Sequence, residues 1–247
     1  NWDQFYFAND KNLYTVENAN GSGTSVTGNR SKYIVEEQRA DPKRIGLNSV
    51  YRKNLLNNRN ITVGLNFNRQ STHYFNVLDD LLGGDFWVDI DQFADRDFDD
   101  PIISQNDLST PNKVAKEGDV IGWDYNIVTR ATSLFGQYEK KWQKVEVYAA
   151  AHLAQTSFRR DGNVQNGRFP ETSEGKGESQ DFLTGGIKAG ATYKITGRQF
   201  IVANAAYLNR PPSPRNSFLS ARTRPDVIPG LQSESVYTGD IGYVVRY

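Results

Sequence analysis

The final stretch of the chain, 234–247, separates into two different surfaces when alternate residues are grouped. A repeat of two residues is typical of a β-strand, whose successive side chains point to opposite faces. One face of this strand is therefore suited to an apolar environment and the other to water. The apolar face consists of Tyr237, Gly239, Ile241, Tyr243, Val245 and Tyr247, and the other face consists of Val236, Thr238, Asp240, Gly242, Val244 and Arg246.

Similar alternation recurs along the chain, between interruptions that contain Gly, Asn and Asp, whereas patterns typical of helices are scarce. The sequence therefore predicts an all-β protein with antiparallel strands. The seven expected strands lie near 31–54, 60–75, 121–141, 144–160, 181–196, 199–210 and 234–247.

The predicted connections alternate in length along the chain. The short ones are 55–60, 141–144 and 196–198, and the long ones are roughly 76–120, 161–180 and 211–233. Soluble β-sandwiches rarely sort their connections in this way. Up-and-down membrane barrels have short periplasmic turns at one rim and long extracellular loops at the other. The alternation therefore favours a transmembrane β-barrel.

Four further strands have one uncharged face, and these faces taken together are rich in Ala and Gly. Such a face would fill a sandwich core poorly, whereas lipid chains adapt to it, and its length matches the 9–11 residues of a tilted membrane strand. The predicted lipid-facing residues are Ile61, Val63, Leu65 and Phe67; Val145, Val147, Ala149, Ala151 and Leu153; Leu183, Gly185, Ile187, Ala189, Ala191, Tyr193 and Ile195; and Ile201, Ala203, Ala205 and Tyr207. The predicted lumen-facing residues include Glu146, His152, Lys188, Lys194, Asn204, Asp240 and Arg246.

The strand at 121–141 is ambiguous, because both of its faces carry apolar residues. One choice of faces would place Arg130 in lipid, at a cost of roughly 2–4 kcal/mol near the bilayer midplane. The opposite choice is therefore preferred. It predicts that the outward residues are Ile127, Thr129, Ala131, Ser133 and Phe135.

Composition narrows the possible functions. The 29 basic and 29 acidic residues balance, which gives no electrostatic case for nucleic acid as a partner. The chain has no cysteine, and this excludes disulfides and thiolate metal sites. Serine occurs without a nucleophile elbow, and no phosphate-binding loop is present. The sequence therefore predicts no enzyme and no cofactor.

Four long stretches resemble the barrel of TonB-dependent outer-membrane receptors, in the branch that carries a carboxypeptidase-like regulatory domain. They occur in the order that the family uses and, with the less distinctive residues 1–54, cover nearly the whole chain. The stretches are "STHYFNVLDDLLGGDFWVDIDQFADRDF" (71–98), "SLFGQYEKKWQKVEVYAAAHLAQTSFRRDG" (133–162), "GRFPETSEGKGESQDFLTGGIKAGATYKITGR" (167–198) and "NRPPSPRNSFLSARTRPDVIPGLQSESVYTGDIGYVVRY" (209–247).

The resemblance implies a barrel of twenty-two strands, filled by a plug domain, in the outer membrane of a Gram-negative bacterium. It also implies import of an extracellular glycan, peptide, siderophore or vitamin, driven by the TonB energy-transducing complex. This chain departs from the family pattern because it has no recognisable signal peptide, energy-coupling box, plug or regulatory domain. Seven strands would also leave two raw edges, which lipid cannot satisfy. We therefore expect residues 1–247 to be a barrel segment that pairs with further strands and a plug.

Two loops contain candidate ligand contacts. The acidic loop 79–101 contains Trp87, Asp89 and Asp91, a combination suited to a sugar or peptide. Its carboxylates also allow calcium as an alternative, although the spacing is not that of an EF-hand. The proline-rich loop 209–230 contains Arg210 together with Arg215, Arg222 and Arg224. These arginines either recognise an anionic ligand or pair with acids such as Asp226.

Two histidines, His73 and His152, are predicted to be ordinary wall residues, because no carboxylate stands at catalytic spacing from them. Two alternatives to the importer remain open from the sequence. The first is a soluble β-sandwich that binds carbohydrate, which requires a second sheet about 10 Å from the first. The second is a passive or adhesive outer-membrane barrel without energy coupling.

Overall fold

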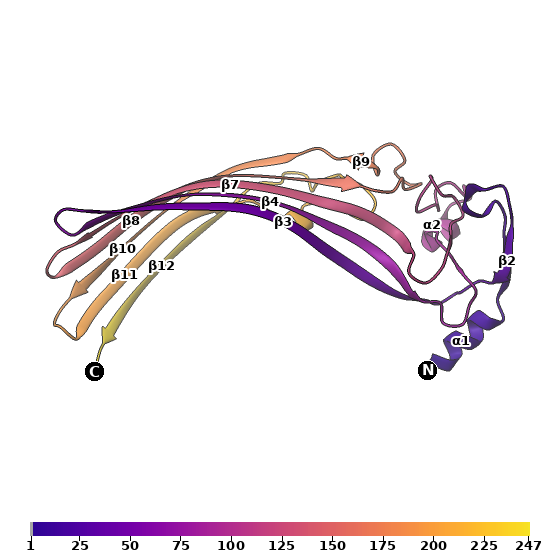
Figure 1. Cartoon of the computed structure of the whole chain (residues 1–247), viewed down its shortest axis with the longest axis horizontal. Coiled ribbons are helices and arrows are strands. Elements are labelled where there is room, and N and C mark those ends of the chain that lie inside the picture. The colour runs from indigo at the N-terminus through magenta and orange to yellow at the C-terminus, as the bar shows by residue number, and fades with distance from the viewer. Residues whose placement is uncertain (1) are drawn as a thin grey trace.

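In the computed structural model, which describes residues 2–247, seven long strands form one bowed antiparallel sheet (Figure 1). Neighbouring strands follow the order β12-β11-β10-β8-β7-β4-β3, so each long strand pairs with the long strands before and after it in the chain. The long strands are β3 (Val35–Leu55), β4 (Arg59–Asp80), β7 (Val120–Lys141), β8 (Val145–Gly162), β10 (Gln180–Lys194), β11 (Gln199–Arg210) and β12 (Glu234–Val245).

The remaining elements are short, and all of them lie in the long connections or before β3. The short elements that Figure 1 labels lie toward the end of the sheet opposite the tight turns. They are α1 (Trp2–Asp10), β1 (Leu13–Val16), η1 (Ala19–Gly21), β2 (Val26–Asn29), β5 (Trp87–Val88), α2 (Gln92–Asp97), β6 (Val114–Ala115), β9 (Gly175–Lys176) and η2 (Pro214–Asn216).

The all-β, antiparallel prediction is confirmed, and the seven long strands lie within a few residues of the expected ranges except at the far end of β4. The sheet is open, because β3 and β12 each pair with a neighbour on one side only. None of the helices in residues 2–247 is long and apolar enough to cross a membrane.

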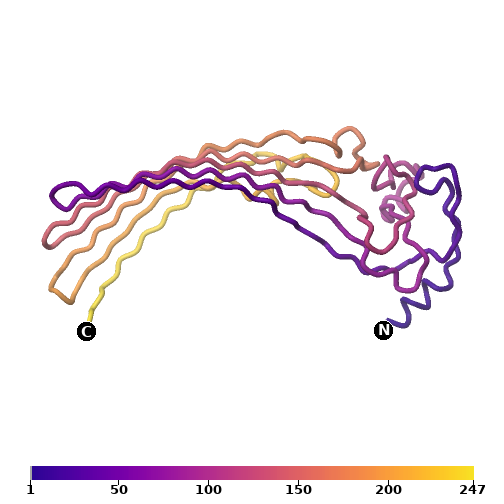
Figure 2. Tube along the Cα trace, in the orientation of Figure 1, coloured from indigo at the N-terminus to yellow at the C-terminus, as the bar shows by residue number. Residues whose placement is uncertain are grey.

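Three tight turns lie together at one end of the sheet, where Figure 2 shows the trace reversing direction. The first joins β3 to β4 through Asn57 and Asn58, whose φ angles are 62° and 55°. Asparagine tolerates this left-handed conformation better than most residues, so the sequence "NN" supports the turn. The other two turns lie between β7 and β8 and between β10 and β11.

The buried apolar side chains are confined to the end of the sheet that carries the long loops. One cluster surrounds Leu78 and Ile121, and another surrounds Phe158 and Phe218. Toward the tight turns, no other segment of residues 2–247 packs on the sheet. Ile187 and Ile241 are 64% and 79% exposed there, so no second sheet of these residues covers them.

Residues that face each other in an antiparallel pair lie on the same side of the sheet, so the register defines two faces. One row across the sheet is Tyr51, Val63, Gly136, Ala151, Ile187, Tyr207 and Tyr237. We call the face that contains this row the apolar face and its opposite the polar face. The apolar face contains every residue predicted to face lipid in β4, β8, β10, β11 and β12, apart from those beyond the strand ends.

The prediction for β7 is wrong. Leu134 pairs with Leu65 and Leu153 on the apolar face, and Tyr138 pairs with Ile61 and Ala149 there. Ile127, Thr129, Ala131, Ser133 and Phe135 therefore lie on the polar face. The ring of Phe135 covers Gly64, because a Cβ added to that glycine would stand 2.2 Å from the ring.

Arg130 lies outside the apolar residues of the sheet even though the predicted register is wrong. Arg130 lies on the apolar face, but in the row of Arg69, Ser157 and Asp181, toward the loop end of the apolar residues. The 22-residue strand β7 extends beyond the 9–11 residues that a bilayer requires. An arginine on the apolar face can therefore lie outside the apolar band.

The apolar residues form a diagonal band across the apolar face. Its centre lies near Leu47 and Ser49 on β3 and at Ile241 on β12. The row that starts at Ile241 passes through Ala203, Ala191 and Val147 and then reaches Lys140 and Arg59. A row across the sheet therefore leaves the apolar band, which runs obliquely to it. The centre shifts by about seven residues over the six steps between neighbouring strands, or about 1.2 residues per strand.

Candidate functional site

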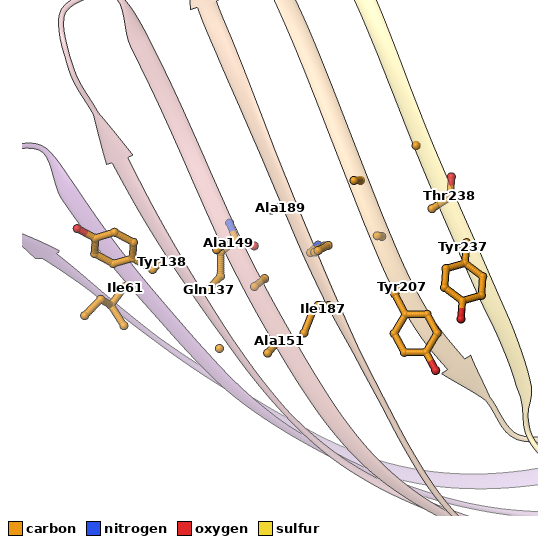
Figure 3. A pocket seen from close by; sticks show the side chains of 16 residues that line it. Ile61, Gln137, Tyr138, Ala149, Ala151, Ile187, Ala189, Tyr207, Tyr237 and Thr238 are labelled. Atoms are coloured by element: carbon orange, nitrogen blue, oxygen red, sulfur yellow. The ribbon is translucent and has the colours of Figure 1, made fainter.

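The centre of the apolar band is a shallow hollow lined by small side chains (Figure 3). Ala149, Ala151, Ala189 and Ala205 form its floor, and Tyr138, Tyr207 and Tyr237 are among the larger residues at its edge. Its volume is about 1020 Å³. The floor offers methyl groups without charge, so it is suited to contact with flexible hydrocarbon.

On the polar face, a hydrogen-bonded chain crosses four strands at the same level. Tyr148 donates its hydroxyl to Asn204 Oδ1 at 3.0 Å, and Asn204 Nδ2 donates to Asp240 at 2.9 Å. Gly190 lies between Tyr148 and Asn204 in the register. A Cβ there would stand 2.3 Å from Asn204 Oδ1 and 2.4 Å from the Tyr148 ring, so the glycine permits this contact.

Replacing Gly190 with alanine is expected to break the Tyr148–Asn204 contact and to destabilise the protein by about 1–3 kcal/mol, the usual cost of overpacking. Urea unfolding of the protein in detergent measures the loss. Gly242→Ala is the matched control, because a Cβ at Gly242 meets nothing within 4 Å. Equal stability of the two variants would show that Gly190 is not needed for close packing.

The other residues predicted to face the lumen also lie on the polar face. Glu146 accepts from Lys194 at 2.6 Å and lies 3.6 Å from Lys141, and Arg246 lies over the ring of Phe200. His152 and Lys188 are exposed on the same face. On β8, β10, β11 and β12, the polar face therefore carries paired and free charges at levels where the apolar face of the same strands carries none.

At the loop end of the polar face, the long loop 211–233 folds onto the sheet. Phe218 is 7% exposed and packs edge-on against Phe158, whose ring stacks on Phe182. Tyr125 and Ile127 complete this cluster from β7. These aromatic contacts attach the loop to three neighbouring strands.

Arg160 is the polar anchor of the same loop. It is 1% exposed, donates Nε to the Ala221 carbonyl at 2.7 Å and Nη1 to the Ser173 carbonyl, and lies over the Tyr125 ring. Burial lowers the pKa of Arg160 to about 10. The side chain therefore stays charged at neutral pH and joins the loops 163–179 and 211–233 to β8.

Three of the predicted arginines of this loop stack on aromatic rings, whereas Arg210 forms a salt bridge with Glu234 at 3.1 Å. Arg215 lies over Tyr74 at 5.7 Å, and Arg222 lies over Trp123 at 4.9 Å. Arg224 lies over Phe169 and stands 3.7 Å from Asp226. Of the two predicted roles, this arginine therefore has the one in which it pairs with an acid. Arg215 and Arg222 are exposed and form a cationic surface on the polar face.

The candidate ligand residues of the acidic loop contact other parts of the protein. Trp87 packs beside the buried Leu78 cluster and is half-buried. Asp91 caps α2, because its Oδ1 accepts from the backbone N–H groups of Phe93 and Ala94. Within residues 2–247, no group of three or more His, Asp or Glu side chains is arranged to hold a metal ion.

Asp89 is buried beneath the same loop. Its Oδ1 accepts from Asn106 Nδ2 and from the Gly122 N–H, both at 2.8 Å. Burial raises the pKa of Asp89, against the lowering effect of these hydrogen bonds. The carboxylate therefore joins the loop 81–119 to the start of β7.

The raised pKa predicts the direction of a pH effect. A folded-state pKa above the unfolded value of about 3.9 means that the folded loop gains stability as the pH falls through the folded pKa. Asp89→Asn keeps the shared acceptor without the charge, so its stability relative to the wild type should increase as the pH rises. Trp fluorescence during urea unfolding at pH 4–8 measures this difference. Asp89→Leu is the control and should be about 1–3 kcal/mol less stable than Asp89→Asn at every pH, because two buried donors lose their acceptor. A pH-independent difference between Asp89→Asn and the wild type would contradict the prediction.

His73 has a carboxylate partner that the sequence spacing did not indicate. Its Nε2 lies 2.6 Å from Asp124 Oδ1, which also accepts from Asn163 Nδ2. The His73 ring stacks on Phe75 on the apolar face, outside the apolar band. The pair connects β4 and β7, and Asn163 links it to the loop that follows β8.

Sequence reasoning missed the cluster of Arg160, Phe158, Phe218 and Trp123. These residues lie far apart in the chain and meet only because β7, β8 and loop 211–233 converge. The proline-rich composition of that loop was the one signal in the sequence that it is ordered. No protein-family model and no curated protein matches this chain.

Proposed function

We propose that this chain is a wall segment of an outer-membrane β-barrel, and specifically of an importer of the TonB-dependent type that its sequence resembles. In this proposal, the apolar face contacts lipid and the polar face lines the lumen and touches a plug. The edges of β3 and β12 pair with further strands of the same barrel. The long loops face outward and contact the imported ligand.

The drift of the apolar band is the observation that carries the proposal. A slab of hydrocarbon crosses tilted strands at one height, so its contact zone moves along each successive strand. With a 3.3 Å rise and strands about 4.8 Å apart, a drift of about 1.2 residues per strand corresponds to a tilt of about 40°. Membrane barrels have strand tilts of 35–45°.

The height of the band supports the same proposal. At this tilt, the apolar residues Val145–Leu153 of β8 span about 20 Å along the barrel axis, and residues 183–195 around β10 span about 30 Å. These values bracket the roughly 25 Å apolar band of outer-membrane barrels. A soluble sandwich would instead require a second sheet over Ile187 and Ile241.

Site-directed spin labelling tests the lipid contact. The chain has no cysteine, so each introduced cysteine in it is a single site. Cysteines at Leu153, Ile187 and Ile241 should be accessible to oxygen and shielded from a water-soluble nickel reagent in liposomes. Cysteines at the neighbouring Ala154, Lys188 and Asp240 should lack the high oxygen accessibility. High nickel accessibility at Ile187 would contradict the proposal.

Energy-coupled import is tested separately from membrane insertion. Cells that produce the complete receptor should lose ligand uptake when the TonB complex is deleted and should retain ligand binding at the surface. Uptake that persists without the complex would favour the passive barrel. The ligand probes are glycans, peptides, siderophores and vitamins.

A further inference from the structure

The loop-side border of the apolar band carries a group of cations on its lipid-facing surface. Arg69 and Arg130 face each other directly in the β4–β7 pair. Lys43 lies one row farther along β3, opposite Ser71. All three residues are exposed, and within residues 2–247 none of the three forms a salt bridge.

This arrangement is unfavourable in the protein alone. Like charges directly opposite each other in a sheet destabilise it, and the nearby acids do not relieve the repulsion. Asp41 is engaged by Arg39, and Asp161 is engaged by Arg159. Asp181 lies two strands from Arg130 in the same row. The facing arginines therefore lack a counterion from the described chain.

The position of these cations indicates the missing counterion. The adjacent row toward the tight turns contains Leu47, Phe67 and Leu183, at the border of the apolar band. A molecule that lay across both rows would need an apolar portion against the band and an anionic group against the cations. Guanidinium groups bind phosphate through paired N–H donors.

We propose that Arg69, Arg130 and Lys43 bind the phosphate head group of a membrane lipid whose acyl chains lie on the apolar band. This inference rests on the proposed barrel and adds a preferred lipid class to it. The opposite border also has a facing cationic pair, Arg59 and Lys140, of which Lys140 lies over the Trp142 ring. A local reporter is therefore needed to separate the two borders.

The test uses the complete protein in detergent micelles, with an environment-sensitive fluorophore on Ser71→Cys beside the cationic group. Dimyristoyl phosphatidylglycerol should change the fluorescence at lower concentrations than dimyristoyl phosphatidylcholine. The double variant Arg69→Gln/Arg130→Gln should require about 30-fold more phosphatidylglycerol for half-saturation, because each cation near an anionic lipid surface contributes about a fivefold effect. Its response to phosphatidylcholine should not change.

The matched control is Arg44→Gln/Lys188→Gln, which removes two charges from the polar face and should leave the response unchanged. If the arginine variant does not fold, 0.5 M sodium chloride should weaken the phosphatidylglycerol response of the labelled parent. Equal responses to the two lipids would overturn the head-group proposal while leaving the barrel intact. If inorganic phosphate binds as tightly as phosphatidylglycerol and displaces it, the cations form an anion site that is not specific for lipid. This result would also overturn the head-group proposal. Failure of the protein to enter liposomes would instead overturn the barrel.

Discussion

Ile187→Lys is expected to prevent stable insertion of the proposed barrel into liposomes. Ile187 lies in the middle of the apolar band and is 64% exposed, so a lysine there would place an ammonium group among the acyl chains. Such a charge costs about 2–4 kcal/mol near the bilayer midplane. Folding yield in liposomes and the urea midpoint measure the loss.

The control is Thr192→Lys, which adds the same charge to the same strand but on the polar face. Thr192 faces Glu146 on β8, so the new ammonium group would lie beside a carboxylate. We expect near-normal insertion of this variant. If both lysine variants insert equally well, the apolar face does not contact hydrocarbon.

Phe218→Ala is expected to release loop 211–233 from the polar face. Phe218 is buried against Phe158, and truncation of a buried phenylalanine costs about 3–5 kcal/mol. A loss of this size would raise the population of the open loop by at least about a hundredfold. At the upper end of this range the loop would be released completely. Limited proteolysis and amide hydrogen exchange of residues 211–233 measure the opening.

Leu219→Ala is the matched control, because the neighbouring Leu219 is 49% exposed. It should change the proteolysis rate little. Protection of residues 211–233 that is unchanged in Phe218→Ala would show that other contacts, such as the Arg160 hydrogen bond to Ala221, are sufficient to hold the loop.

The sequence predicted the long strands well because alternation and turn residues are local signals. The faces of β4, β8, β10, β11 and β12 followed from the same alternation. β7 failed because apolar residues occur on both of its faces. Its register depends on distant partners, including Gly64 beneath the Phe135 ring and Leu65 beside Leu134.

The short elements before β3 were missed for a related reason. The α1 sequence "WDQFYFAND" has no clear apolar stripe, and its position depends on tertiary contacts. The buried Asn9 donates to the carbonyls of Tyr33, Leu81 and Leu82 and accepts from the Lys32 N–H. Contacts across more than seventy residues cannot be recognised from local pattern.

The candidate site was predictable in kind but not in detail. The composition of loop 209–230 predicts Arg215 and Arg222 as ligand contacts, and this stays a prediction. The rings beneath them, Tyr74 and Trp123, come from β4 and β7 and were not predicted. The acidic loop suggested ligand contacts at Asp89 and Asp91. In the structure, their oxygens accept hydrogen bonds within the protein.

The open edge of β3 has a consequence for biogenesis. This strand has 21 residues, and about half of its backbone N–H and C=O groups point away from β4. Each such group costs several kcal/mol in hydrocarbon if it has no partner. In the proposed barrel, a half-built wall would therefore be expelled by the bilayer, and we expect ring closure and membrane entry to occur as one cooperative event.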